Sequence, residues 1–224
     1  LRRLCKISGI RWIRILYCYP EEITEELIQT IKEEPKICHY LDLPIQHASD
    51  DVLKRMGRRT SKEELIHIIS RIREEIPDIT LRTTLITGFP GESKEQHEEL
   101  MDFVDEMAFG RLGVFTYSAE DGTPAAQMPD QVEESVKEAR RAELMELQQE
   151  IAFDQAEQMI GREVLVMIEG KVADENAYVG RTYKDAPNVD GLIFVNTDTE
   201  LLSGDFAKVR VTGACEYDLI GELM

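Results

Sequence analysis

Residues 81–93, Leu-Arg-Thr-Thr-Leu-Ile-Thr-Gly-Phe-Pro-Gly-Glu-Ser, decide the fold. Their first seven residues are rich in β-branched side chains and predict a strand, which runs into a Gly-Phe-Pro-Gly-Glu turn. Ser93, with Gln96 three residues later, forms the capping box of a following helix. Gly88 and Gly91 permit positive φ angles and let a flat ligand approach the main chain. A strand that ends in such a loop predicts a ligand site, because open α/β sheets and barrels bind ligands there.

The same strand-then-helix pattern occurs four times in the N-terminal two thirds of the chain. Each strand is a short β-branched or aromatic run, and each is followed by apolar residues at helical spacing. The expected strands are residues 12–17, 37–43, 79–87 and 112–117. Four such units in a row predict parallel strands joined by right-handed crossovers. The last unit ends in a long helix, residues 130–160.

After Gly161 the apolar periodicity changes from that of a helix to that of a strand. Five short alternating stretches follow, separated by Gly, Asp and Asn. They are residues 164–168, 177–180, 192–195, 206–211 and 217–220. So many short strands in so short a segment predict a small, closed or nearly closed β-barrel. We therefore expect two domains, residues 1–158 and 159–224.

The composition predicts a globular protein without a membrane segment. Apolar residues make up 42% and charged residues 31%, and no stretch approaches the ~18 apolar residues that a spanning helix needs. The first residues lack the apolar run of a signal peptide, so we expect a cytoplasmic location. The first residue is not Met, so we expect a piece of a longer chain. The net charge of −18 disfavours binding to nucleic acid phosphates and suits a basic partner.

The cysteines and histidines show no metal-binding spacing. No Cys-x-x-Cys, His-Glu-x-x-His or His-x-x-x-His pair occurs. The residues concerned are Cys5, Cys18, Cys38, Cys215, His39, His47, His67 and His97. We expect structural thiols in a reducing compartment and no metal site built from this chain alone.

Several strand-end motifs resemble those of the radical S-adenosylmethionine (SAM) methylthiotransferases, and the resemblance covers essentially the whole chain. The motifs are Trp12–Tyr17, Asp42–Ser49 with Met56–Arg58, Gly88–Glu92, and Tyr117–Ser118 with Gly122–Thr123. The C-terminal part resembles a TRAM domain, with Gly180–Thr182 and Asp185–Gly191 as its most specific run. The resemblance implies an α/β partial (βα) barrel of the radical SAM type, truncated at its N-terminal side. A small all-β, OB-like TRAM barrel would follow it.

The loop after the second strand distinguishes two branches of that family. In the branch that modifies tRNA adenosine it usually reads Gln-Ser-Gly-Ser, whereas this chain has Gln46-His47-Ala48-Ser49. The resemblance is therefore to the RimO-type branch, which methylthiolates an aspartate of small-subunit ribosomal protein S-twelve. Residues 151–224 hold 14 acidic and 6 basic side chains, a net charge of −8 that suits a basic ribosomal protein better than tRNA. Two alternatives stay open: a tRNA adenosine methylthiotransferase, and a non-enzymatic module that binds a basic protein.

The resemblance implies SAM and 4Fe-4S clusters as cofactors. In the family, a Cys-x-x-x-Cys-x-x-Cys loop after the first barrel strand holds a cluster that reduces SAM, and the resulting radical abstracts a substrate hydrogen. This sequence contains no such loop. We therefore expect the cluster ligands upstream of residue 1, and we expect the fragment alone to be inactive. An uncovered edge of its parallel sheet also predicts self-association of the fragment.

The resemblance places a cofactor site at the strand ends, without assigning a catalytic residue. The expected SAM-binding residues are Gln46, His47, Ser49, Arg82, Thr87, Gly88, Phe89, Phe115, Tyr117 and Ser118. Structural alternatives stay open for some of them: Ser49 as a helix cap beside a surface His47, Arg82 in an internal salt bridge, and Phe115 and Tyr117 in aromatic core packing. We expect the strand tips to meet at one rim, with the acidic C-terminal barrel docked beside that rim to receive a basic protein.

Overall fold

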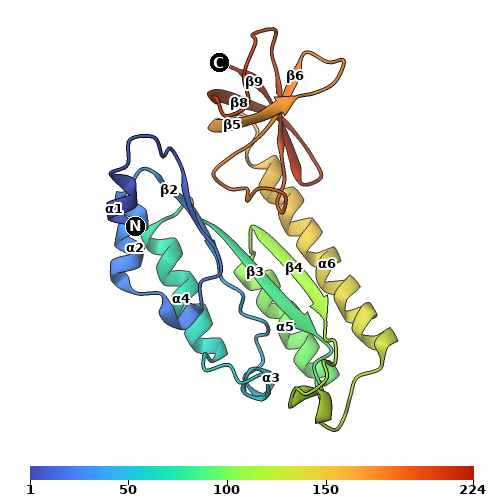
Figure 1. Cartoon of the computed structure of the whole chain (residues 1–224). Coiled ribbons are helices and arrows are strands. Elements are labelled where there is room, and N and C mark those ends of the chain that lie inside the picture. Colours follow the sequence, from blue (N-terminus) through green and yellow to red (C-terminus); the bar gives the residue numbers. More distant parts are fainter.

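The computed structural model describes all 224 residues as two packed parts, which Figure 1 shows one above the other. The N-terminal part is a four-stranded sheet of order β1-β2-β3-β4, and the C-terminal part is a barrel closed in the order β5-β6-β7-β9-β8. Both parts have the architecture that the strand patterns predict. None of the helices combines the length and the apolar character that a membrane span requires.

The N-terminal sheet is parallel throughout, as expected from its strand-helix units. Its strands are β1 (Ile13–Ile15), β2 (Ile37–Asp42), β3 (Thr80–Thr87) and β4 (Arg111–Thr116). The helices are α1 (Arg2–Cys5), α2 (Glu25–Glu33), α3 (Asp50–Arg55), α4 (Lys62–Glu75), α5 (Lys94–Met107) and α6 (Glu134–Glu157). Two 3-10 turns complete this part, η1 (Pro20–Glu22) and η2 (Ala125–Gln127).

Side-chain capping starts α4 and α5 where the sequence predicts it. Ser61 and Ser93 each close a capping box at the start of α4 and α5. The long helix α6, expected from residue 130, begins at Glu134 instead. Asp130 has φ +60°, outside the helical range, and its carbonyl accepts the Gly91 N–H at 2.8 Å. This residue therefore belongs to the loop that abuts the β3–α5 turn.

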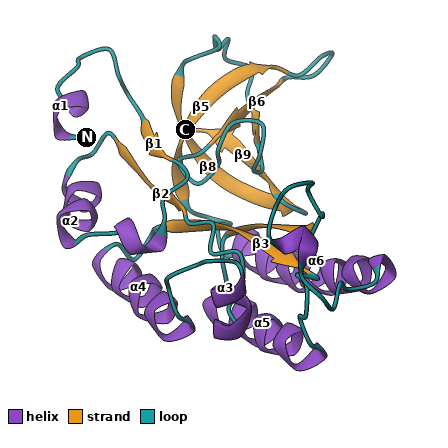
Figure 2. Ribbon diagram, turned by 60° about the horizontal axis from the view of Figure 1, so that its bottom comes forward, coloured by secondary structure: helices purple, strands orange, loops and turns teal.

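Helices cover only one of the two faces of the sheet. Leu81 and Leu85 of β3 pack on the helices in one large core with Leu100 and Phe103 of α5. By strand alternation, Arg82, Thr84 and Ile86 lie on the opposite face. Figure 2 shows α2, α4 and α5 together on one side of the strands. We call the other side the open face, meaning the sheet face opposite these three helices.

Helix α6 runs along the outer edge of β4 (Figure 1). Its side chains donate hydrogen bonds to main-chain carbonyls there. Four donors on α6 each hydrogen-bond a carbonyl in or beside β4: Lys137 to Tyr117, Arg141 to Val114, Gln148 to Phe109, and Gln155 to Ala108. An edge strand covered in this way presents few free main-chain groups with which a strand of another chain could pair. The remaining edge strand is β1.

The C-terminal barrel leaves no strand edge free, since its sheet closes on itself. Its strands are β5 (Glu163–Lys171), β6 (Ala177–Arg181), β7 (Ile193–Asn196), β8 (Phe206–Cys215) and β9 (Asp218–Leu223). Alternate residues such as Val164, Val166 and Ile168 point inward and form its core.

The barrel docks at the beginnings of the parallel strands, not beside the rim where they end. Asp185 pairs with Arg111, the first residue of β4, and the Tyr183 hydroxyl donates to the main chain of Asp78 just before β3. The expectation that the acidic barrel sits beside the strand tips is therefore wrong. The reason is electrostatic: arginines near the strand beginnings on the open face attract the acidic segment of the barrel.

Candidate functional site

The loops that follow β2, β3 and β4 meet at one rim. The Gln46 N–H donates to the Thr84 carbonyl at 3.0 Å, and the Ile86 N–H donates to the Gln46 carbonyl at 2.8 Å. The Tyr117 N–H donates to the Thr87 carbonyl at 2.9 Å. Main-chain hydrogen bonds thus tie the three strand ends together, which is the common rim that the sequence predicts.

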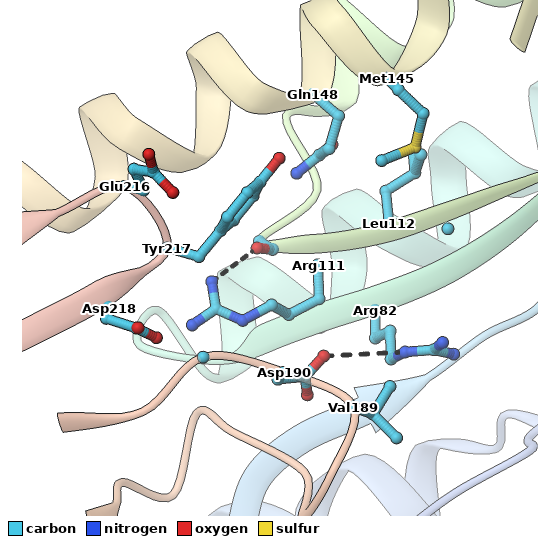
Figure 3. Close-up of a pocket in the computed structure, with 13 residues that line it drawn as sticks. Arg82, Arg111, Leu112, Met145, Gln148, Val189, Asp190, Glu216, Tyr217 and Asp218 are labelled. Atoms are coloured by element: carbon cyan, nitrogen blue, oxygen red, sulfur yellow. Dashed lines mark hydrogen bonds and ion pairs between the residues drawn. The ribbon is translucent and has the colours of Figure 1, made fainter. Parts of the chain in front are cut away.

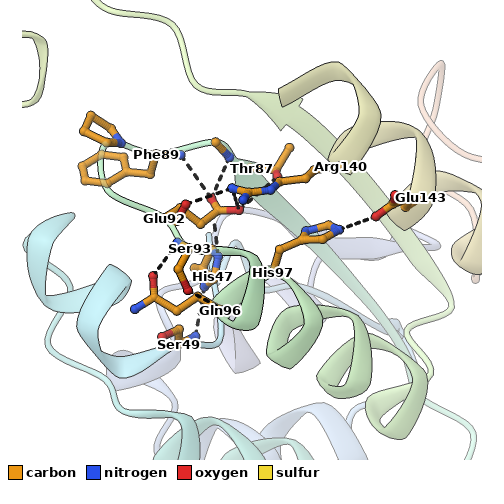
Figure 4. A network of polar contacts seen from close by, with 12 residues as sticks. His47, Ser49, Thr87, Phe89, Glu92, Ser93, Gln96, His97, Arg140 and Glu143 are labelled. Carbon is orange, nitrogen blue, oxygen red and sulfur yellow. Dashed lines mark hydrogen bonds and ion pairs between the residues drawn. The ribbon is translucent and has the colours of Figure 1, made fainter. Parts of the chain in front are cut away.

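Glu92 organises the glycine-containing loop at this rim (Figure 4). Its carboxylate accepts the N–H groups of Gly88 at 2.6 Å and Phe89 at 3.1 Å, and the Thr87 hydroxyl at 3.4 Å. Arg140 of α6 forms an ion pair with this carboxylate, with Nη1 2.9 Å from Oε1. The Glu92 side chain is fully buried, so a charged, hydrogen-bonded group fixes the loop from inside the protein.

His47 is buried beneath the loop, not on the surface as one alternative predicted. Its Nδ1 accepts the Ser49 N–H at 2.9 Å, and its Nε2 lies 3.7 Å from the Glu92 carboxylate. Burial, together with the electrostatic influence of His97, Arg55 and Arg140, lowers the pKa of His47 from 6.5 to about 3. The ring is therefore neutral. Ser49 stands at the N-cap position of α3, as the cap alternative expects, but its side chain makes no capping hydrogen bond.

Two residues at the rim adopt positive φ for different reasons. Gly88 has φ +73°, and a Cβ added there would overlap Lys137 Cγ, so only glycine fits beside α6. Gln46 also has φ +73°, although it carries a side chain. A non-glycine residue in this region costs about 1–3 kcal/mol, and such strain often marks a functional site.

The open face near the rim presents an aromatic ring and a cation. Phe115 is 60% exposed and pairs in register with Ile86. Arg82 donates from Nη1 to Asp42 at 3.0 Å, which is the internal salt bridge left open by the sequence. Gly113 lies between them: a Cβ there would be 3.8 Å from the Phe115 ring and 4.0 Å from Arg82 Nη2. A flat patch of main chain therefore separates the two side chains.

Tyr117 and Ser118 follow β4 but face different surroundings. Tyr117 is buried, its ring packs edge-on against Phe89 at 5.1 Å, and its hydroxyl has no hydrogen-bond partner. Ser118 is exposed and its hydroxyl donates to Glu120 at 3.3 Å. The aromatic-packing alternative thus describes Tyr117 but not Phe115.

The expected site residues consequently form two groups. Gln46, Arg82, Phe115 and Ser118 have surface available at the rim or on the open face. The others, buried behind the rim, are His47, Ser49, Thr87, Gly88, Phe89 and Tyr117. Gly113 and Glu92 are not among the site residues expected from the sequence. A glycine inside a strand pattern was the available signal for Gly113.

One hollow beside the sheet lies away from the rim. A cavity of about 420 Å³ lies between the beginning of β4, α6 and the barrel, lined in part by Arg111, Gln148 and Tyr217 (Figure 3). No group of three or more His, Cys, Asp or Glu side chains is arranged to hold a metal ion, and all four cysteines are free.

Comparisons with known proteins agree with this geometry. Residues 1–104 match the radical SAM superfamily, and residues 160–224 match the TRAM domain. Ribosomal protein uS12 methylthiotransferase RimO of Lachnoclostridium phytofermentans is 65% identical over 221 residues, covering 99% of this chain and 50% of that protein. RimO of Desulfitobacterium hafniense is 49% identical over 224 residues, covering 100% of this chain and 50% of that protein. Over its whole length the chain is similar to the radical SAM methylthiotransferases of the RimO type.

This radical SAM chain spans about half the length of the curated relatives it matches. Its parallel sheet is part of a radical SAM barrel, and its closed five-stranded barrel is the TRAM domain. The family implies SAM and 4Fe-4S clusters as cofactors. The cluster does not fit the residues of this chain, because its cysteines lie apart and no ligand group exists. SAM does fit, since the open face combines an exposed ring, a cation and accessible main chain.

Proposed function

We propose that the full-length protein that contains this chain attaches a methylthio group to an aspartate of ribosomal protein uS12. The observation that carries the proposal is the 65% identity, over 99% of the chain, to a relative that is named for this reaction. The net charge of −18 agrees with a basic ribosomal target. A ribosomal target also agrees with the cytoplasmic location expected from the sequence.

We place SAM on the open face at the rim. Phe115 offers an exposed ring on which adenine can stack, and Gly113 beside it leaves the main chain approachable. Gln46 and Ser118 supply polar groups at the same rim. When bound, SAM supplies the radical chemistry, while these residues bind and orient it.

We assign Arg82 to the carboxylate of the SAM methionyl group. Asp42 holds the guanidinium through Nη1, and both side chains are mostly buried. A guanidinium has five N–H donors, so this pairing leaves donors for a second carboxylate. The internal salt bridge and the cofactor contact are therefore compatible roles of one side chain.

We propose that the buried members of the site act by holding the loops. His47, Ser49, Thr87, Phe89 and Tyr117 are each at most 9% exposed. His47 binds the main chain of Ser49, Thr87 binds Glu92, and Phe89 packs on Tyr117. Removing these side chains would move the rim, and a displaced rim loses cofactor affinity. The 4Fe-4S ligands, in this proposal, lie upstream of residue 1.

The test uses the full-length protein with reconstituted clusters, SAM, reductant and uS12. We expect mass spectrometry to find one methylthio group on an aspartate of uS12. Unmodified uS12, with methylthiolated adenosine in added tRNA, would instead support the tRNA alternative.

The cofactor site is tested separately by binding. Phe115→Ala should weaken SAM binding about tenfold, the effect of losing one stacking contact and its buried area. Phe194→Ala, a half-buried aromatic change in the TRAM barrel, should leave SAM binding unchanged. Equal affinities of the two variants would remove Phe115 from the site.

A further inference from the structure

One segment of the TRAM domain, Thr182–Gly191, reaches into the open face of the radical SAM sheet. Cys38 and Tyr40 of β2 lie on that face and are buried in a small cluster with Ala186 of the segment. The Tyr40 ring is 0% exposed, although no helix covers this side of the strand. The segment is therefore what covers the sheet near the strand beginnings.

Arginines on three different strands hold the segment in place. Arg14 of β1 donates to the Tyr183 carbonyl at 2.6 Å, and Arg111 of β4 pairs with Asp185. Arg82 of β3 lies with its Nε 3.8 Å from Asp190 Oδ1 (Figure 3). Two acidic side chains of one segment thus meet cations of the sheet, so charge complementarity and not apolar area selects this docking position.

Asp190 is the residue that connects both domains most directly. Its Oδ2 accepts the Tyr40 hydroxyl at 2.8 Å and the Ala186 N–H at 2.8 Å. Its side chain is only 3% exposed. One oxygen therefore fixes the segment to β2, while the other faces the guanidinium of Arg82.

Arg82 contacts both Asp190 of the TRAM segment and polar residues of the sheet. Its Nη1 contacts Asp42, its register partner at the end of β2, at 3.0 Å and Thr84 Oγ1, further along β3, at 3.5 Å. A guanidinium held between two buried carboxylates has little freedom to reorient. Its free donors are thus aimed by residues of both domains.

We propose that Thr182–Gly191 closes the open face of the sheet at the strand beginnings and that Asp190 acts, through Arg82, as a positioning residue for SAM. The closing contact concerns this chain alone, whereas the positioning role rests on the proposed function. The TRAM domain then does more than bind a partner: it completes the wall of the site in the neighbouring domain.

Cys38 gives a direct measure of the closing contact. Docking of the segment buries the thiol, and burial raises the pKa of Cys38, so little reactive thiolate is available. Cys215 is exposed and serves as an internal reference in the same protein. Alkylation by iodoacetamide, quantified for each cysteine peptide by mass spectrometry, therefore reports whether the segment is docked.

The experiment compares two substitutions of Asp190 in the full-length protein, with Glu200→Gln as the control on an exposed TRAM residue. Asp190→Ala removes all three carboxylate contacts, so Cys38 alkylation should rise about tenfold or more relative to Cys215. Asp190→Asn keeps acceptors for Tyr40 and Ala186 but removes the charge opposite Arg82. Cys38 should then stay protected, while SAM affinity, measured by equilibrium dialysis, should fall about three- to tenfold.

Each outcome decides a separate part of the proposal. Cys38 protection in Asp190→Ala equal to that in the control would overturn the closing role. Unchanged SAM affinity in a protected Asp190→Asn protein would overturn the positioning role. If the unmodified protein binds no SAM, the proposed function and the positioning role fail together, while the alkylation result still decides the closing contact.

Discussion

At the scale of single residues, the rim depends on a few buried polar groups that hold main chain. Glu92 binds two N–H groups of the loop and one guanidinium, and His47 stays neutral beside it. Neither side chain is exposed to solvent, so both shape the site without contacting a bound ligand.

The fit of Gly88 against Lys137 can be tested by adding one methyl group. Gly88→Ala combines an unfavourable φ with an overlap at Lys137 Cγ, so we expect a loss of about 2–4 kcal/mol in the free energy of unfolding. Gly122→Ala is the matched control, because Gly122 has φ +82° but open space around it. That change should cost about 1 kcal/mol. Equal losses in urea denaturation would show that packing on Lys137 contributes nothing.

The depressed pKa of His47 predicts a specific loss of stability in acid. The unfolded protein gains a proton on His47 below its ordinary pKa of 6.5, whereas the folded protein resists protonation down to about 3. Stability from this residue is therefore complete above pH 6.5 and falls by about 1.4 kcal/mol for each pH unit below it.

Urea denaturation of His47→Asn from pH 7 to pH 4.5 measures this effect. Asparagine can still accept the Ser49 N–H but cannot titrate, so its stability curve should be flatter than that of the unmodified protein. His67→Gln, at an exposed position of α4, should keep the original slope. Parallel curves for all three proteins would contradict a buried, neutral His47.

At the scale of secondary structure elements, α6 acts as a cover for the edge of β4. Its donors at 137, 141, 148 and 155 follow one stripe of the helix and each meets a carbonyl. Helix and strand are thus joined by hydrogen bonds where a neighbouring strand would otherwise pair. This arrangement keeps the end of the sheet closed to a second chain.

Gln148→Leu should reveal the contribution of this cover. Gln148 is 2% exposed and donates to the Phe109 carbonyl at 2.9 Å. The change leaves that carbonyl buried without its donor, so we expect a loss of about 1–3 kcal/mol in thermal or urea denaturation. Gln149→Leu, at the next and exposed position, should stay within about 0.5 kcal/mol of the unmodified protein. If Gln148→Leu leaves the free energy of unfolding unchanged, another group must donate a hydrogen bond to the Phe109 carbonyl.

At the scale of the whole molecule, the two domains are joined by buried charge pairs as well as by α6. Asp185 is 3% exposed and takes the guanidinium of Arg111 on one side and the Thr182 hydroxyl, at 2.7 Å, on the other. Breaking such a pair leaves an uncompensated charge in the interface. The domains should therefore unfold as one cooperative unit.

Arg111→Met tests that coupling. We expect a loss of about 3–5 kcal/mol and a separation of the single unfolding transition into two, followed by calorimetry. Arg210→Met breaks an ion pair with Glu163 in which both side chains are more than half exposed. This control should cost below about 1 kcal/mol and keep one transition. One transition in Arg111→Met would mean that the α6 connection alone couples the domains.

Local patterns in the sequence determined much of this protein. The capping boxes at Ser61 and Ser93, the strand around residues 80–87 and the change of period after Gly161 depend on neighbours within a few residues. Such patterns can be recognised without knowledge of the fold. They therefore predict the parallel sheet, the small barrel and the strand-end rim.

Tertiary structure alone decided which rim residues are buried and where the TRAM domain docks. His47 follows a strand and Phe115 lies near the end of one, yet His47 is fully enclosed and Phe115 is 60% exposed. Asp190 meets Tyr40 across 150 positions of sequence, and no local pattern encodes such a pairing. Burial and charge pairing arise only when distant segments pack together, because the cost of burying a charge depends on the partner that the fold supplies.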